Sequence, residues 1–390
     1  MGLLRVILAL VVVAGHNQLA HIDIATGVIV AVKAFFVISG FYMALILTER
    51  YNDAGLSIFW TNRLLRLMPM YYLMLAVTFL AATRSPMSTL GVLIDLRPWK
   101  NVLSSQGWGW LKAYLVFTNL SGLGIETTVY GCLDPATMTL HPFRGGCAGD
   151  ILNRFVLIPQ AWSISVELVF YAFAPLIIRS SNRQLAVLLG ISGLVRLAIV
   201  TTSLNVNPWN RSVAPFETIY FLLGVTSYRL YAYSRSRRIP TGLPRIATLG
   251  MWTFTAGFAW LSSAFGLSVL NESWLWWFYF ASLTLALPFV FRFSKESRLD
   301  AAIGELSYPI YLSHVLVLGM FHEYGGRWLH DAVGGHLGWQ LLNIGTVLLL
   351  SQALVTLVGQ PVDRFRRARW AEGKTAAPRC KPGTSVIGIG

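Results

Sequence analysis

The chain has 390 residues, of which 55% are hydrophobic and only 12% are charged, and it contains 14 Trp, 15 Tyr and 22 Phe. This composition excludes an ordinary water-soluble domain, in which about 25% of the residues are charged. The net charge of +14 does not indicate nucleic-acid binding, because the basic residues lie in short segments beside apolar stretches, where they set membrane topology and contact anionic lipid. We therefore expect membrane lipids, and no nucleic acid, among the partners.

Apolar stretches long enough to cross a bilayer recur along the chain. A spanning helix needs about 20 mainly apolar residues, and by that criterion the sequence offers about ten candidates. They cover residues 3–21, 27–47, 67–83, 160–178, 184–203, 213–231, 246–266, 273–291, 306–322 and 339–358. The predicted fold class is therefore all-α, a polytopic membrane helix bundle with about ten transmembrane helices.

The distribution of Lys and Arg predicts the orientation. With the N-terminus inside, about twenty of these residues fall in inside segments and about eight in outside segments, which predicts that both termini are cytoplasmic. The remaining ones, Arg5, Lys33 and Arg196, fall within or at the edge of predicted spans. Residues 1–358 are then a transmembrane core, and residues 359–390 are a basic cytoplasmic tail.

The segments outside the spans differ in character. The external loop at about 84–159 contains Gly, Pro and aromatic residues, which predicts an ordered loop with a short interfacial or re-entrant piece at Trp108–Leu120. Cys132 and Cys147 lie in this loop, and the sequence is compatible with a disulfide between them and with two unpaired thiols. The tail lacks apolar periodicity and is expected to be disordered from about residue 371.

The first apolar stretch carries two ionisable residues, Arg5 and His16. A charged side chain inside the bilayer costs about 2.5 to 3.5 kcal/mol on insertion scales, so each needs a partner or a function. In a helix, eleven residues make about three turns, which places both side chains on one face about 16 Å apart along the axis. Alternatively, Arg5 extends to the inner interface and His16 is a buried histidine bonded to a neighbouring helix.

The next polar groups lie in and after the second stretch. Ser39 and Gly40 are small residues that allow another helix to approach closely. Arg63 and Arg66 are one helical turn apart, just inside the membrane. Paired guanidinium groups suit phosphate oxygens, which they bind with two parallel donors. The preference for positive charge on the inner side explains the same pair equally well.

Two further ionisable residues lie within later stretches. Glu167 is a few residues below the predicted outer surface, where an unpaired carboxylate would take up a proton or bind a cation. His314 lies near the middle of its stretch, and a second intramembrane histidine favours a polar cavity, although both residues also fit structural roles. No tight cluster of His, Cys or Asp with ligand spacing appears, so we predict no metal site.

Taken in order, these blocks resemble the membrane-bound acyltransferase family 3, integral membrane O-acyltransferases of polysaccharides and other sugars. The blocks are Arg5 and His16 with ten residues between them, Phe35–Phe41, Arg63 and Arg66 with Pro69 and Tyr71, Trp162–Glu167, Ser307–His314, and Gln360–Arg364. The sequence departs from the family pattern at Lys33, Ser313 and Gln360, departures that bear on acceptor recognition rather than on the core chemistry.

The resemblance implies transfer of an acyl group, usually acetyl, to a hydroxyl of a cell-envelope or exported carbohydrate or of a lipid-linked sugar. The donor is a cytoplasmic acyl-CoA (acetyl-CoA), which is a co-substrate, and no cofactor is permanently bound. By this resemblance Arg5, Arg63 and Arg66 hold the anionic end of acyl-CoA. The expected location is a bacterial inner (plasma) membrane.

The remaining residues receive catalytic or supporting roles under the same reading. His16 acts as the general base on the acceptor hydroxyl or carries the acyl group itself. Glu167 orients and stabilises the imidazolium or binds the sugar. Ser39, Tyr308 and His314 donate hydrogen bonds to the developing oxyanion.

Two other classes of protein use similar features. A secondary transporter of a small polar or anionic substrate also places His, Arg and Glu inside a comparable number of helices. A flippase or polymerase partner for lipid-linked sugars is the other alternative. Acyl-CoA dependence distinguishes both from an acyltransferase.

Overall fold

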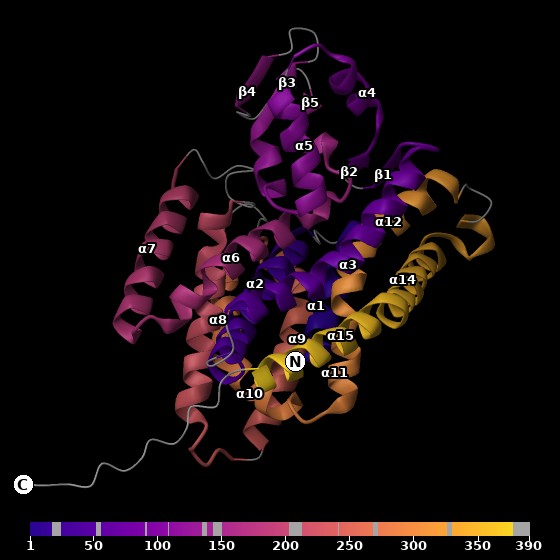
Figure 1. Ribbon diagram of the computed structural model, residues 1–390. Coiled ribbons are helices and arrows are strands. Elements are labelled where there is room, and N and C mark those ends of the chain that lie inside the picture. Colours follow the sequence, from indigo (N-terminus) through magenta and orange to yellow (C-terminus); the bar gives the residue numbers. More distant parts are fainter. Residues whose placement is uncertain are drawn as a thin grey trace, which may run out of the picture.

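The structure is a computed structural model that describes residues 1–17, 25–51, 56–89, 92–107, 109–134, 139–142, 150–202, 213–240, 242–267, 272–325 and 330–376. Helices dominate it (Figure 1). The long ones are α1 (Gly2–His16), α2 (Ala25–Glu49), α3 (Leu56–Ala82), α6 (Trp162–Arg179), α7 (Asn182–Val200), α8 (Ala214–Ser234), α9 (Gly242–Ala264), α10 (Trp274–Ser294), α12 (Ser307–Tyr324) and α14 (Gly335–Leu354). Each predicted apolar stretch overlaps one of these helices, which confirms the all-α prediction.

Seven of the described helical segments are long and apolar enough to cross a membrane by length and composition. The chain is therefore a multi-pass membrane protein. The helix α1 has 15 residues and ends at His16, before the predicted span does, and residues 18–24 lie outside the described part of the chain. Neither α8 nor α9 is among the seven segments. The count of about ten spans and the side on which the termini lie stay predictions.

The helix α2 lies in the middle of the bundle and packs against α1, α6 and α8. Its contact with α8 is very close: a Cβ added to Gly224 would lie 2.0 Å from a backbone oxygen of α2, and one added to Gly40 would lie 2.1 Å from the carbonyl oxygen of Phe221. The predicted role of Gly40 in close helix packing is confirmed. The ring of Phe221 stacks on Phe36 of α2 and on Phe170 of α6, with centroids 4.8 and 4.1 Å apart. These rings join three helices.

A small folded cap, formed between α3 and α6, replaces the simple ordered loop that the sequence predicted (Figure 1). It contains the helices α4 (Arg97–Ser104) and α5 (Gly109–Ser121), the strands β1 (Met87–Thr89), β2 (Val92–Ile94), β3 (Gly131–Asp134), β4 (Thr139–Pro142) and β5 (Asp150–Ile151), and the 3-10 turns η1 (Ile125–Tyr130) and η2 (Leu152–Phe155), followed by η3 (Pro159–Ala161) before α6. The strands β1 and β2 pair antiparallel, and β3 lies between β4 and β5.

The cap has a hydrophobic core of its own, and α5 belongs to it. Leu111 and Leu115 of α5 pack with Leu133 of β3 and Phe155. The helix α5 covers most of the segment for which the sequence predicted an interfacial or re-entrant piece. Cys132 in β3 is disulfide-bonded. The candidate partner Cys147 lies outside the described residues.

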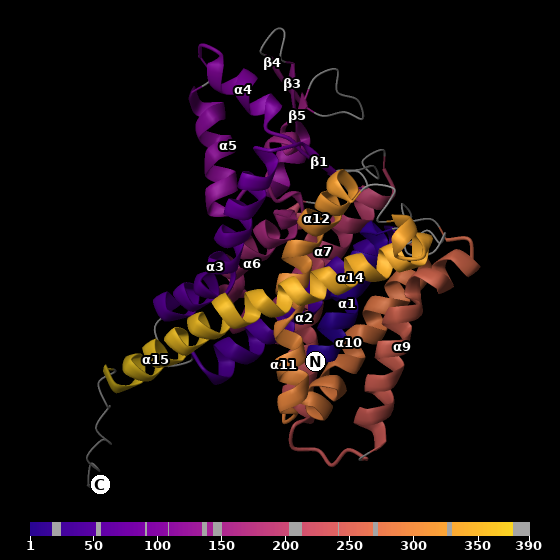
Figure 2. The ribbon, with the colours of Figure 1, turned by 90° about the vertical axis from the view of Figure 1, so that its right-hand side faces the viewer.

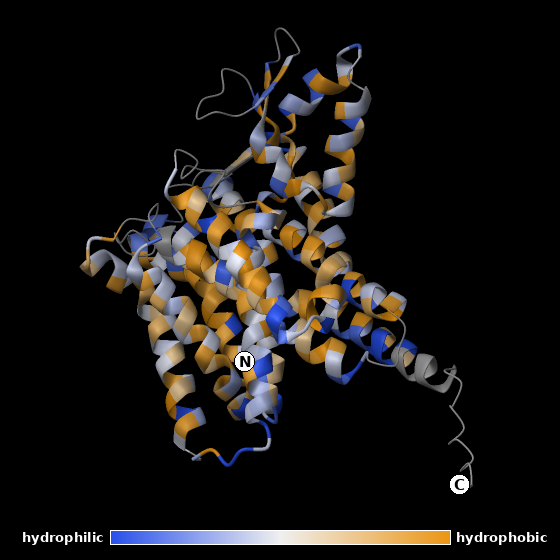
Figure 3. Cartoon of the chain, turned by 90° about the vertical axis from the view of Figure 1, so that its left-hand side faces the viewer, coloured by the Kyte–Doolittle hydropathy of each residue, from blue (hydrophilic) through white to orange (hydrophobic). Residues whose placement is uncertain are grey.

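The end of the bundle away from the cap holds α11 (Arg298–Glu305) and α15 (Gln360–Ala376). The helix α14 continues through the π-helical turn η4 (Val355–Gly359) into α15, and Figure 2 shows them as one long rod lying obliquely across the bundle. In Figure 3 hydrophobic residues cover the bundle helices, whereas α15 is largely hydrophilic. The basic tail is helical as far as Ala376, beyond residue 371, where the predicted disorder begins. Most of the segment with predicted disorder, residues 377–390, lies outside the described part.

Candidate functional site

A large cavity, here called the basic cavity, opens among α1, α3, α11 and α15. Its volume is about 640 Å³, within the range of small-molecule and cofactor sites. Basic side chains outnumber acidic ones in its lining. The basic ones are Arg5, Arg50, Arg63, Arg66, Lys295, Arg366 and Arg367, and the acidic ones are Glu49, Asp300, Glu305 and Asp363. This cavity is suited to an anionic ligand.

A smaller chamber of about 90 Å³, here called the polar chamber, adjoins the basic cavity. The two share lining residues: Arg5, Tyr42, Arg63, Arg66 and Tyr308. The polar chamber is further lined by Phe35, Phe36, Ser39, Ser163, Glu167, Tyr171 and Tyr311, among others. The three predicted donor-binding arginines thus lie together where the two spaces meet, and Ser39, Glu167 and Tyr308 lie in the smaller one.

Arg5 is held in place by the first turn of α1. The carboxylate of Asp300 in α11 accepts hydrogen bonds from the backbone N–H groups of Gly2 at 2.6 Å and Leu3 at 2.9 Å. A carboxylate at this position satisfies free donors of the helix N-terminus and complements its dipole. A Cβ added to Gly2 would lie 1.7 Å from the carbonyl oxygen of Asp300, so the two helices meet closely here. Arg5 therefore lines the basic cavity.

The arginines of α3 differ in exposure. Arg63 is buried, and its Nε has no hydrogen-bond partner in the part of the chain that the structure describes. Arg66, one turn further along, is exposed at the junction of the two spaces. An unsatisfied buried guanidinium nitrogen is unfavourable unless a ligand supplies the acceptor. This pair is arranged for phosphate or carboxylate oxygens.

Glu167 is held from two sides in the polar chamber. Its Oε1 accepts a hydrogen bond from Ser39 Oγ of α2 at 2.6 Å and another from the hydroxyl of Tyr171, one turn further along α6. Tyr308 donates its hydroxyl proton to the carbonyl oxygen of Leu67 at 2.9 Å. The hydroxyl protons of Ser39 and Tyr308 are therefore already engaged, and either group must reorient before it can donate to an oxyanion.

The two predicted histidines lie side by side. The ring centroids of His16 in α1 and His314 in α12 are 5.2 Å apart. Nδ1 of His314 is 2.6 Å from the carbonyl oxygen of Tyr311. Because a carbonyl only accepts hydrogen bonds, Nδ1 carries the proton, and Nε2 of the neutral ring bears the lone pair. This Nε2 is buried without a hydrogen-bond partner among the described residues, so His314 offers an acceptor toward the pair rather than a donor.

Tyr311 connects the histidine pair to the polar chamber. Its hydroxyl lies 2.8 Å from Ser163 Oγ and donates to the carbonyl oxygen of Gln160 at 2.9 Å, and its ring centroid lies 5.8 Å from that of His314. Sequence reasoning gave this residue no role, although it stands three positions before His314 within a quoted block. Among the described residues, no hydrogen bond or ion pair joins His16 to Glu167, so the structure brings Glu167 to the chamber and His16 to His314.

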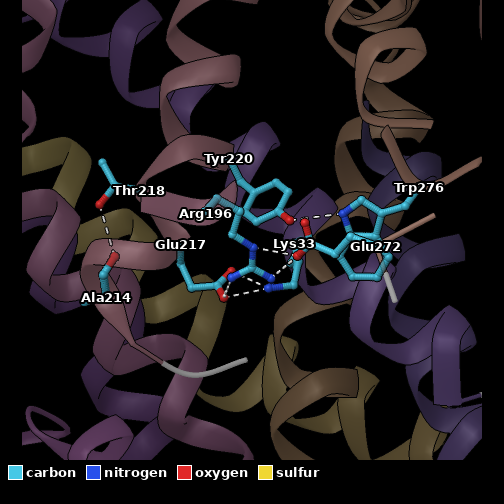
Figure 4. A network of polar contacts seen from close by, with 8 residues as sticks. All are labelled: Lys33, Arg196, Ala214, Glu217, Thr218, Tyr220, Glu272 and Trp276. Atoms are coloured by element: carbon cyan, nitrogen blue, oxygen red, sulfur yellow. Dashed lines mark hydrogen bonds and ion pairs between the residues drawn. The ribbon is translucent and has the colours of Figure 1, made fainter. Parts of the chain in front are cut away.

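Lys33 lines neither space and belongs to a separate buried network (Figure 4). Its Nζ lies 2.6 and 2.7 Å from the two carboxylate oxygens of Glu217 at the start of α8. Arg196 of α7 lies 3.5 Å from Glu217 and also pairs with Glu272, just before α10. The Nζ of Lys33 lies 4.9 Å from the ring centre of Tyr220. All four charged side chains are buried, and their charges sum to zero.

Within the described residues, no group of three or more His, Cys, Asp and Glu side chains is arranged to hold a metal ion. The site is instead a basic cavity that leads to a polar chamber inside a multi-pass helix bundle, an arrangement for an anionic ligand that extends into the protein. The family model of acyltransferase family 3, an acyltransferase domain, matches residues 1–358. The chain therefore belongs to this family and is an acyltransferase. No curated protein and no solved structure is significantly similar to it.

Proposed function

We propose that the protein is an O-acetyltransferase that moves an acetyl group from cytoplasmic acetyl-CoA to a hydroxyl of a cell-envelope or exported carbohydrate. The observation that carries this proposal is the pair of adjoining spaces with Arg5, Arg63 and Arg66 at their junction. Acyl-CoA carries phosphates at one end and the reacting thioester at the end of a long arm. A wide basic cavity that narrows into a polar chamber fits both ends.

The size of the polar chamber favours a short acyl group. Its volume of about 90 Å³ corresponds to a few water molecules, which each occupy about 30 Å³ in the liquid. A two-carbon acyl group fits such a space, whereas a long acyl chain would have to leave it between the helices. The same three arginines at the entrance would hold the pyrophosphate or the arm beside it.

We assign the activation of the acceptor to His16, which lies beside His314 and is not among the residues that line the polar chamber. His16 lies about 16 Å beyond Arg5 along α1, a distance that the extended arm of CoA can cover. His16 takes the proton of the acceptor hydroxyl as the oxygen attacks the thioester carbon, the carbon–sulfur bond breaks, and the proton passes to the leaving thiolate. The lone pair on His314 Nε2 can hold His16 in the required tautomer through an N–H bond. A transient acyl group on His16 fits the same geometry.

The acceptor would approach from the side of the cap. The disulfide-bonded Cys132 in the cap fits an oxidising compartment outside the cytoplasm, which supports the orientation with the basic cavity facing the cytoplasm. Acetyl-CoA is available on the cytoplasmic side, and the growing or exported glycan is on the outer side. A bacterial inner membrane has both, and Glu167 is the carboxylate that a sugar hydroxyl would meet in the chamber.

The test is acetyl-CoA turnover by protein purified into nanodiscs, with a panel of crude envelope glycans. We expect glycan-dependent CoA release from the wild type, a loss of 100-fold or more in His16→Ala, typical of a missing general base, and weaker acetyl-CoA binding in Arg66→Ala. Arg183→Ala is the matched control, because Arg183 is exposed at the start of α7 and lies outside the lining of the basic cavity.

Three outcomes would contradict the proposal. A folded wild-type protein that binds no acetyl-CoA and shows no acyl-CoA dependence with intact envelope extract would exclude this donor. Uptake of a small anionic solute into proteoliposomes without acyl-CoA would favour a transporter. An equal loss of acetyl-CoA binding in Arg183→Ala and Arg66→Ala would mean that general surface charge, and not the basic cavity, attracts the donor.

A further inference from the structure

One face of the continuous helix η4–α15 forms a wall of the basic cavity. The lining residues in this segment are Val355, Val358, Gly359, Val362, Asp363, Arg366 and Arg367. They follow one another at alternating intervals of three residues and one residue, so they form a single stripe along the helix. The two arginines end this stripe. Apart from its first turn this wall lies beyond residues 1–358, the part matched by the family model.

The wall is held against α3, the helix that carries Arg63 and Arg66. Both η4 and α15 contact α3. A Cβ added to Gly359 would lie 2.7 Å from the terminal carbon of Met70, so the two helices are close at this point. π-helical turns such as η4 occur frequently at functional sites. The result is that two arginines of α15 face two arginines of α3 across one space.

Arg366 is only partly satisfied by the protein. Its Nη1 donates to Asp363 one turn earlier, which fixes the side chain along the cavity wall. Its Nε is buried without a hydrogen-bond partner in the described part of the chain, and the same holds for Nε of Arg63 on the opposite wall. Arg63 and Arg66 lie near enough to add their positive potential at Arg366. Two guanidinium groups that line the basic cavity thus each keep a buried Nε without a partner among the described residues.

We infer that α15 binds the nucleotide end of the acyl-CoA donor, with its phosphates between Arg366 and Arg367 on one wall and Arg63 and Arg66 on the other. This inference rests on the proposed function. The residues of η4 and α15 line the basic cavity, and none of them is among the residues that line the polar chamber. They therefore face the end of the donor that is far from the reacting carbon.

The test separates the two ends of the donor. Displacement of labelled acetyl-CoA from nanodisc-embedded protein is measured with adenosine 3′,5′-bisphosphate, the nucleotide end alone, and with S-acetylpantetheine, the thioester end alone. Arg366→Gln should weaken acetyl-CoA and the bisphosphate about tenfold or more, as expected for loss of hydrogen bonds to a charged group, and leave S-acetylpantetheine within twofold of the wild type.

Arg364→Gln is the matched control, because Arg364 is exposed on the same helix, carries the same charge and lies outside the cavity lining. It should behave like the wild type. Arg367→Gln is a second test variant, since Arg367 is exposed, so that its replacement leaves the buried packing intact. Thermal unfolding of each variant shows whether the fold is retained.

The outcomes separate this inference from the function on which it rests. If the wild type binds acetyl-CoA and both cavity variants bind it as tightly as Arg364→Gln does, α15 has no part in donor binding and only the inference fails. Equal weakening of both fragments by Arg366→Gln would also overturn it, because the effect would not be confined to the phosphates. A wild type that binds none of the three probes would overturn the proposed function together with the inference.

Discussion

Two groups of charged residues lie in the bundle, and they are built in opposite ways. Around Lys33, two cations and two carboxylates from four segments contact one another directly, and their charges cancel (Figure 4). Around Arg66, guanidinium groups line a space of about 640 Å³ and positive charge is in excess. Buried nitrogens on Arg63 and Arg366 lack hydrogen-bond partners among the described residues. The first arrangement holds helices together, and the second is completed by a ligand.

The comparison shows that the type of a buried charged residue does not reveal its role. A charge taken out of water is unfavourable until its partner is present, so a cluster that is neutral by itself needs no further counter-charge. A cluster with excess charge around an open space is favourable only when counter-charge enters. Both clusters contact α2, which carries Lys33 in one and Tyr42 in the other, so the neutral cluster also positions the wall of the polar chamber.

The largest effect is expected when one partner is removed from the neutral cluster. Glu217→Gln leaves Lys33 and Arg196 buried with Glu272 as their remaining carboxylate. Breaking a buried pair in this way typically costs about 3 to 5 kcal/mol. The measurement is the free energy of unfolding in detergent, with Glu296→Gln as the control, since Glu296 is 88% exposed. A loss below about 1 kcal/mol would show that water or an anion compensates.

Removing one charge of each sign should restore most of this loss. Lys33→Met together with Glu217→Gln leaves Arg196 and Glu272 as a neutral pair. Because replacing a buried ion pair by uncharged groups is often nearly neutral, the double variant should be more stable than either single variant. The unfolding free energies of the wild type, the two single variants and the double variant form a double-mutant cycle. Additive losses in that cycle would mean that the pair is not coupled.

Removing a charge from the basic cavity should have the opposite effect on the stability of the ligand-free protein. Arg66→Gln removes one positive charge from a cluster in which positive charges repel one another. The ligand-free protein should therefore keep its stability or become slightly more stable. Acetyl-CoA affinity should fall by about 1.5 to 3 kcal/mol, the value of a hydrogen bond to a charged group. The shift in melting temperature caused by saturating acetyl-CoA is the measurement. Lower stability without ligand would place Arg66 in the scaffold.

The smallest expected effect is that of salt. The basic cavity is open, so raising ionic strength from about 0.05 to 0.5 M should weaken acetyl-CoA binding several-fold by screening. The neutral cluster is buried, and its contribution to stability should change little over the same range. Binding isotherms and unfolding curves at matched salt concentrations compare the two. Equal salt sensitivity of acetyl-CoA binding and of the unfolding free energy would contradict the difference in burial between the two clusters.

The sequence predicts the helices well and the site in part. Length and apolarity place all the long helices, because lipid requires each spanning segment to satisfy its backbone internally. The spacing of Arg5 and His16 and the pair Arg63 and Arg66 identify polar faces, since ionisable residues are rare in such helices. The structure adds that the arginines meet at one junction and that His16 pairs with His314.

The partners in the neutral cluster could not be predicted. Lys33 and Glu217 are 184 positions apart. Glu217 and Glu272 lie at the starts of helices, where an acidic residue in the sequence does not indicate a buried ion pair. Apolar periodicity gives no help, because the lipid-facing side of a membrane helix is as apolar as its packed side. Likewise, only the fold shows that Arg366 faces the basic cavity while Arg364 does not.

The wide separation of Lys33 from Glu217 also has a consequence for how the chain is made. At about 5 to 20 residues per second, synthesis needs roughly 10 to 40 s to travel the 184 positions between them. During that time α2 carries a cation whose carboxylate partner does not yet exist. The nascent α2 therefore carries an unpaired Lys33, at an insertion cost of about 2.5 to 3.5 kcal/mol, until α8 arrives.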